Sequence, residues 1–195
     1  FKRFIKNSYK NGQQPRRVCR GCSCNMGEKK MDVTLVPYGN EADTAIGLII
    51  RFWQAHNHET PTREEAAEDL TQWTKEGHRL YFIRYGGEAV GLVHLGSRGG
   101  EIDWLEEIFV LPEFQGRGIG TRAIALAEEI VKAYSESFYI EAAARNAKAI
   151  RLYRKLGYDC LNTITIRKDF QAERFETLST ERILNMDFQV RRYKE

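Results

Sequence analysis

A glycine-dense stretch follows a strand-like segment that ends at Pro112. Gly116, Gly118 and Gly120 stand at alternate positions there, and a helical pattern follows. Glycines so placed let the backbone turn tightly and bring bare N–H groups against a ligand. At a helix N-terminus, unpaired donors and the positive end of the macrodipole attract anions. The stretch therefore predicts a phosphate or pyrophosphate site.

Two common phosphate loops are excluded by the spacing of these glycines. A dinucleotide-binding G-x-G-x-x-G that began at either of the first two glycines would need a further glycine at Thr121 or Ala123. A Walker loop needs a lysine directly after its last glycine, where this chain has Thr121. The pattern that remains is Gln115-x-x-Gly118-x-Gly120.

A second informative segment spans residues 141–158, downstream of the first helical pattern. Asn146 is a good N-cap for a helix, and Gly157 suits the position just after its end. Tyr153 lies between these two residues, on the apolar face of the predicted helix. The segment therefore predicts a capped amphipathic helix that presents a tyrosine.

The two segments together resemble the GNAT superfamily of N-acetyltransferases. The pyrophosphate arm of that family has the pattern Q/R-x-x-G-x-G/A, and its closing element is an Asn-led helix with an inward tyrosine. The resemblance implies an α/β fold with a twisted mixed sheet, helices on both faces and a V-shaped cleft between strands four and five. It also implies that acetyl-CoA is the co-substrate and that a primary amine attacks it directly. No acyl-enzyme is expected, because neither motif contains cysteine or serine.

The resemblance also assigns residues to the site. The amides of the pantetheine arm are expected to pair with the splayed edge of the fourth strand, and the pyrophosphate is expected to rest on the turn and helix start. The cofactor-binding set is Ile108, Phe109, Val110, Gln115, Gly116, Arg117, Gly118, Ile119, Gly120, Thr121, Asn146 and Tyr153. Tyr153 matches the family tyrosine that protonates the departing thiolate. A backbone N–H near Val110 or Leu111 is the expected oxyanion donor, and no metal is expected.

The base that takes the proton of the amine is sought at Glu106 and Glu107. A carboxylate in a half-buried strand is expensive unless it is used or paired. Alternation along the strand predicts that Glu106 shares a face with Ile108 and Val110, and that Glu107 lies on the other face. The local sequence also resembles the segment of aminoglycoside N-acetyltransferases in which a glutamate holds the acceptor amine. We favour Glu106, while Glu107 and a path through water stay open because a bulge would alter the register.

Periodicity and turn residues predict the order β-α-α-β-β-β-α-β-α-β-β over residues 31–192. The expected strands near the cleft are residues 101–110 and 137–143. The last two strands are expected at residues 159–167 and 182–191. Cys160 is expected to pack in the core near the start of its strand.

Charge divides the chain into a leader, residues 1–30, and a domain, residues 31–195. The leader holds nine Lys or Arg and one Glu, whereas the domain has a net charge of −5. The leader also holds Cys19, Cys22 and Cys24, too few ligands for a zinc site without a fourth from elsewhere. It is expected to be a disordered basic arm.

An acidic domain argues against a nucleic-acid partner and favours a cationic acceptor. No apolar run is long enough for a membrane span or a secretory signal, so a cytoplasmic location is expected. The acceptor is left open among a small cationic metabolite, an aminoglycoside-like compound and a protein amine. A homodimer and a non-catalytic module that only binds acyl-CoA are open as well.

Overall fold

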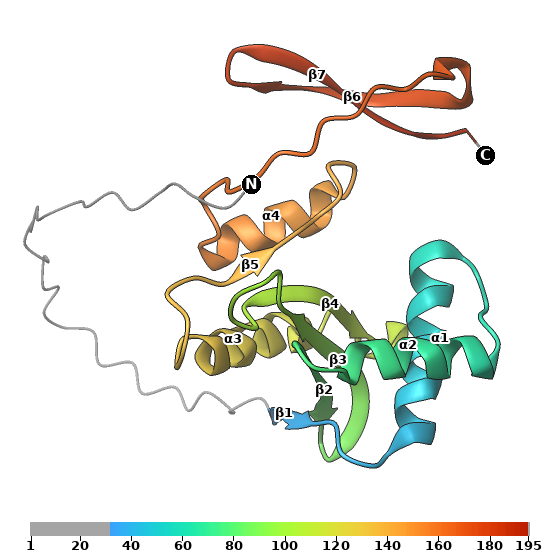
Figure 1. Cartoon of the computed structure of the whole chain (residues 1–195), viewed down its shortest axis with the longest axis vertical. Coiled ribbons are helices and arrows are strands. Elements are labelled where there is room, and N and C mark those ends of the chain that lie inside the picture. Colours follow the sequence, from blue (N-terminus) through green and yellow to red (C-terminus); the bar gives the residue numbers. More distant parts are fainter. Residues whose placement is uncertain (1–31, 195) are drawn as a thin grey trace, which may run out of the picture. The chain divides into compact units, whose positions relative to one another are not determined.

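The computed structural model describes residues 32–194, so the predictions made for residues 1–30 lie outside the described part of the chain. The first nine strands and α-helices follow the predicted order, and the structure has the expected mixed α/β class (Figure 1). The strands are β1 (Val33–Pro37), β2 (His78–Tyr85), β3 (Glu88–Gly96), β4 (Trp104–Val110), β5 (Tyr139–Ile140), β6 (Phe175–Ile183) and β7 (Met186–Tyr193). The α-helices are α1 (Ala42–Asn57), α2 (Arg63–Thr74), α3 (Ile119–Val131) and α4 (Ala147–Leu156). None of these helices is long and apolar enough to cross a membrane.

The main sheet has the order β1-β2-β3-β4-β5, antiparallel through β4 and parallel between β4 and β5. The α1–α2 pair and α3 cover opposite faces of this sheet (Figure 1). Alternate residues along β2 show why: Leu80 and Phe82 pack with α1 and α2, whereas Tyr81 and Ile83 pack with α3. Each helix thus buries its apolar face against one side of the sheet.

Local signals account for several of these boundaries. Thr62 and Glu65 form the expected capping box at the start of α2. Gly86 and Gly87 both have positive φ and form the tight turn between β2 and β3. Gly157 ends α4 in the left-handed conformation, as expected for a glycine at that position.

Three strand predictions near the C-terminus are wrong in extent. The segment predicted at 137–143 is a strand only at Tyr139–Ile140, because only those two residues pair with β4. Residues 159–167 form no strand, and Cys160 is exposed rather than packed in a core. The segment predicted at 182–191 contains a turn, since Leu184 and Asn185 both have positive φ. A separate two-stranded sheet, β6–β7, forms around that turn.

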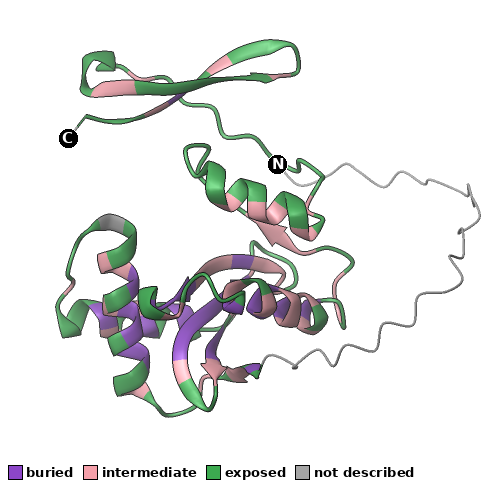
Figure 2. Ribbon diagram, turned by 180° about the vertical axis from the view of Figure 1, so that it is seen from behind, coloured by how far each residue is buried: buried purple, intermediate pink, exposed green. Residues whose placement is uncertain are grey.

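Burial is concentrated in one part of the described chain (Figure 2). The central strands and the inner faces of α1, α2 and α3 carry most of the buried side chains, whereas α4 has none. Val190 is the buried residue of the β6–β7 hairpin. The buried strands β3 and β4 therefore provide a rigid base for the side chains between α3, α4 and the sheet.

Candidate active site

The glycine turn is built by two residues with positive φ. Gly116 has φ 74° and Gly118 has φ 79°, conformations that side chains rarely adopt. Gly118 is the N-cap of α3 and supplies no side-chain cap, so the N–H groups of the first turn are left for a ligand. Gly120 lies inside the helix and has a different role. Because it has no side chain, a ligand can approach the backbone closely at this position. The turn therefore has the form of an anion site at a helix start.

A cavity of about 320 Å³ opens in front of this helix start. Four elements contribute to its wall: the end of β4, the glycine turn, α3 and α4. Nine of the predicted cofactor residues line it, namely Ile108, Val110, Gln115, Gly116, Gly118, Ile119, Gly120, Thr121 and Tyr153. The fold therefore brings together residues that are up to 45 positions apart in the sequence.

Three of the predicted cofactor residues do not line this cavity. Phe109 is buried on the opposite face of β4, where its ring meets Phe52 of α1 edge to face. Arg117 turns back and donates to the carbonyl oxygen of Glu113 at 2.9 Å. Asn146 accepts from a backbone N–H in the first turn of α4 at 3.1 Å, as an N-cap does. A direct role for these three side chains in binding the cofactor stays a prediction.

The side chain of Gln115 has a local task. Its Nε2 donates to the carbonyl oxygen of Val110 at 2.8 Å, which pairs the last backbone acceptor of β4. The N–H of Leu111 donates to the carbonyl oxygen of Val90 at 2.9 Å and is therefore in use within the sheet. Because backbone groups alternate sides along a strand, the N–H of Val110 points toward the open side of β4. Of the two N–H groups considered from the sequence, that of Leu111 is thus in use, and a role for Val110 as the oxyanion donor stays a prediction.

The expected splay between β4 and β5 is present. The two strands pair only at Trp104–Tyr139 and Leu105–Ile140, and β4 continues to Val110 with this edge unpaired. A free strand edge offers N–H and C=O groups to an extended ligand. The gap begins next to Glu106, so the two glutamates stand where the strands separate.

The predicted alternation at these glutamates is wrong because β4 carries a bulge. The register between β3 and β4 shifts at His94, which is paired with Glu107, whereas Leu95 is paired with Leu105. Glu106 is therefore an extra residue that no position of β3 faces. The predicted face shared by Glu106, Ile108 and Val110 depended on unbroken pairing.

Both carboxylates instead lie on the face of the sheet covered by α1 and α2. A Cβ added at Gly96 would come within 2.8 Å of Oε1 of Glu106. Glu107 is hydrogen-bonded to Nδ1 of His94, which lies two residues before Gly96 on the same face of β3. Ile108 and Val110 line the cavity beside α3 on the other face. The gap between β4 and β5 thus has an anion site on one side and two carboxylates on the other.

Each glutamate has its own partner. Glu106 accepts a hydrogen bond from Arg98 at 3.3 Å, and Arg98 also donates to Glu141 at 2.8 Å. The guanidinium lies 3.8 Å from the centre of the Trp104 ring. These two hydrogen bonds, first the one that Arg98 donates to Glu141, raise the pKa of Arg98.

Glu107 stands at one end of a series of hydrogen-bonded side chains that continues through two histidines. Its partner His94 has only 4% of its side chain exposed and stacks on Trp73 of α2, with ring centres 5.0 Å apart. Nε2 of His94 lies 2.8 Å from Nδ1 of His78. The sequence analysis missed both histidines because they are 16 residues apart, and only the pairing of β2 with β3 brings them together. The residues next to each histidine in the sequence do not indicate this contact.

Tyr153 lies where the sequence analysis expected it, on the inner face of α4 and in the wall of the cavity. Its ring meets that of Tyr158 edge to face, with centres 6.1 Å apart. Burial raises the pKa of the Tyr153 hydroxyl, so the group is protonated at neutral pH. A protonated phenol beside the cavity can donate a proton to a leaving group.

Comparison with known proteins gives a consistent result. The family model described as the acetyltransferase (GNAT) family matches residues 48–158. Spermidine N(1)-acetyltransferase of Escherichia coli K12 is 34% identical over 92 residues, which are 43% of this chain and 46% of that protein. Thialysine N-epsilon-acetyltransferase of Mus musculus is 38% identical over 82 residues, 42% of each chain. The chain thus spans less than half the length of either relative.

Solved structures agree with the fold. Aminoglycoside N-acetyltransferase AAC(6')-Iy in complex with CoA has a TM-score of 0.56 at 15% identity, covering 73% of this chain and 98% of that one. An aminoglycoside acetyltransferase from an uncultured soil sample, in complex with sisomicin, has a TM-score of 0.55 at 14% identity. That match covers 70% of this chain and 95% of the other. At such identities the likeness concerns the fold alone.

Proposed function

The chain belongs to the GNAT acetyltransferase family, and on that basis we propose that it transfers the acetyl group of acetyl-CoA to a primary amine of a small cationic molecule. The observation that carries the proposal is the placement of the two halves of a transfer site on opposite sides of one gap. The helix start with its unpaired N–H groups lies on one side of β4, and Glu106 and Glu107 lie on the other.

The residues in the cavity fit the CoA part of the co-substrate. The N–H groups of Ile119, Gly120 and Thr121, at the start of α3, suit a pyrophosphate. The unpaired edge of β4 from Glu106 to Val110 suits the amides of the pantetheine arm. When bound, acetyl-CoA supplies a thioester whose carbonyl carbon is open to attack by an amine.

Three tasks then fall to the chain itself. The N–H of Val110 is free to stabilise negative charge on the carbonyl oxygen. Tyr153, protonated at neutral pH, donates a proton to the departing sulfur. Glu106, with Glu107 beside it, binds the acceptor amine, because two neighbouring carboxylates that are partly exposed attract an ammonium group.

A cationic acceptor is favoured over a neutral one for two reasons. The carboxylates at the gap outnumber their one guanidinium partner, Arg98. The relatives are named for spermidine and thialysine, and two fold neighbours for aminoglycosides, all of which are amines. We place the site in the cytoplasm, where acetyl-CoA is made available to such enzymes.

The experiment is release of CoA thiol from acetyl-CoA with a panel of amines. The panel contains spermidine, thialysine, an aminoglycoside and a lysine-containing peptide, with an amine-free reaction as the control. We expect turnover with one or more of the small polycations and little with the peptide. CoA binding by calorimetry without turnover on any amine would instead support a module that binds acyl-CoA and does not catalyse transfer.

A further inference from the structure

Hydrogen bonds link Glu107, His94 and His78 in a series that runs from the gap beside β5 across β4, β3 and β2. Within residues 32–194, no group of three or more His, Cys, Asp or Glu side chains is arranged to hold a metal ion. We therefore treat Glu107, His94 and His78 as a series linked by hydrogen bonds. His94 uses both ring nitrogens, Nδ1 toward Glu107 and Nε2 toward His78. By whole-residue exposure, His94 is the one polar or charged residue counted as buried among residues 32–194. A buried ring with two fixed partners specifies one geometry.

The chemistry of the partners fixes the direction of these hydrogen bonds. An ionised carboxylate only accepts, so Nδ1 of His94 carries the proton that it donates to Glu107. In this tautomer Nε2 of His94 accepts, so Nδ1 of His78 is its donor. The His94 ring stacks on Trp73, with ring centres 5.0 Å apart, and its two nitrogens are held by Glu107 and His78, so rotation of the ring is restricted. The Nδ1–H of His94 is thereby aimed at Glu107 before any substrate binds.

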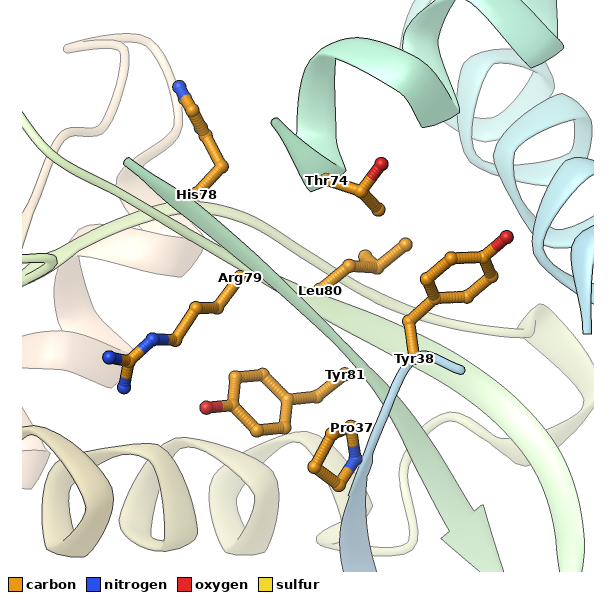
Figure 3. Close-up of a pocket in the computed structure, with 7 residues that line it drawn as sticks. All are labelled: Pro37, Tyr38, Thr74, His78, Arg79, Leu80 and Tyr81. Atoms are coloured by element: carbon orange, nitrogen blue, oxygen red, sulfur yellow. The ribbon is translucent and has the colours of Figure 1, made fainter. Parts of the chain in front are cut away.

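The far end of this hydrogen-bonded series, His78, is the first residue of β2. His78 is half-buried and lines a pocket of about 350 Å³ beside Thr74 and Leu80. Figure 3 shows that His78 and Arg79 point to opposite sides of β2, so the guanidinium of Arg79 lies away from the imidazole.

We propose that His94 and His78 position Glu107 so that it takes the proton of the acceptor ammonium, while Glu106 and Arg98 bind the acceptor. The proposal rests on the acetyl transfer proposed above. In this step one N–H bond of the ammonium breaks, and its electron pair stays on nitrogen for attack on the thioester. The proton bonds to a carboxylate oxygen of Glu107 and leaves to solvent after the product does. His94 and His78 touch neither substrate; they are positioning residues.

The charges around Glu107, His94 and His78 are compatible with this assignment. Burial, then His94 and Lys75, lower the pKa of His78, while Glu106 and Glu107 raise it by less. His78 is therefore neutral at pH 7 and has one N–H to donate. Glu106 has the guanidinium of Arg98 as its partner, whereas Glu107 has the imidazole of His94. We therefore assign binding of the acceptor to the Glu106–Arg98 pair and the proton to Glu107, whose position the two histidines fix.

The first test is the acid limb of the pH profile of kcat/KM, measured with the best amine of the panel. Losing a hydrogen bond to an ionised carboxylate raises its pKa, so His94→Leu should move the limb up by about 1–2 pH units. His94→Asn places an amide N–H near the position of Nδ1 and should restore most of the shift. His78→Phe keeps the ring and removes its N–H, so it should give a smaller upward shift. Glu107→Gln should abolish the limb.

Controls separate this effect from a change of charge or fold. Glu129→Gln alters an exposed carboxylate of α3, whose partner is Lys132, and should leave the limb unchanged. If His94→Leu fails to fold, the His78→Phe and His94→Asn profiles still decide. An active wild type whose acid limb is unmoved in His78→Phe and in a folded His94→Leu protein would overturn the proposal. A wild type that releases no thiol with any amine would instead overturn the proposed function.

A second test needs no turnover. Nitrogen-15 NMR of imidazole-labelled protein should show His94 with its proton on Nδ1 and with a downfield Nδ1–H resonance. That resonance should shift upfield or be lost in Glu107→Gln and persist in Glu106→Gln. A His94 protonated on Nε2 alone, or a resonance insensitive to Glu107→Gln, would refute the geometry on which the proposal stands.

Discussion

Gly120→Val tests the anion site most directly because the structure separates its effect on binding from its effect on folding. Gly120 is not among the glycines with positive φ, so a side chain is not strained there. A Cβ at this position meets only Cγ2 of Val110, at 3.8 Å, an ordinary contact. Valine also has a somewhat higher helix propensity than glycine, by a few tenths of a kcal/mol. The variant should therefore fold with nearly unchanged stability.

The effect on CoA binding should be large because Gly120 lines the cavity at the helix start. A branched side chain there keeps a pyrophosphate from approaching the N–H groups of the first turn. A hydrogen bond to a charged group contributes about 1.5–3 kcal/mol. Loss of one or two such bonds, about 2–4 kcal/mol, weakens binding by about 30- to 1,000-fold.

The assay is calorimetric titration of CoA into the purified variant, with chemical denaturation as the check on folding. Gly120→Ala is the matched control, because its single methyl group occupies far less of the cavity mouth and should weaken binding by much less. A graded loss from alanine to valine is the expected result. A folded Gly120→Val protein that binds CoA with the wild-type Kd would refute the placement of the pyrophosphate at this helix start.

The remaining predictions concern the transfer chemistry and the sheet. Tyr153→Phe should leave CoA binding intact and lower kcat by about 10²–10³-fold, as the loss of a proton donor does; a full kcat, measured by thiol release, would assign Tyr153 to packing alone. Glu106→Gln should raise KM for a cationic acceptor while the acid limb stays in place; an unchanged KM would remove Glu106 from the site. Gly91→Ala should destabilise the protein at the upper end of about 1–3 kcal/mol, because its Cβ would lie 2.1 Å from a backbone oxygen of β4. Gly47→Ala, on an open surface of α1, should stabilise it by about 0.5–1 kcal/mol, and denaturant unfolding compares the two.

The sequence alone was sufficient for features that depend on neighbouring residues. The glycine turn before α3 follows from the need for positive φ at Gly116 and Gly118. The Asn146 cap and the Gly157 end of α4 follow from local hydrogen bonding. The order of the first nine strands and α-helices and the position of Tyr153 were predicted correctly because periodicity reports which face of an element is buried.

Tertiary structure decided what depends on pairing between strands. The bulge at Glu106 arises where β4 meets β3, and it placed both glutamates on one face, against the alternation expected from β4 alone. His78 and His94 share a hydrogen bond only because β2 and β3 bring them side by side. The extent of β5 and the turn at Leu184 likewise depend on which residues find a partner strand. Local sequence encodes a helix through contacts three or four residues apart, whereas strand register is set by contacts between distant residues, which no single segment contains.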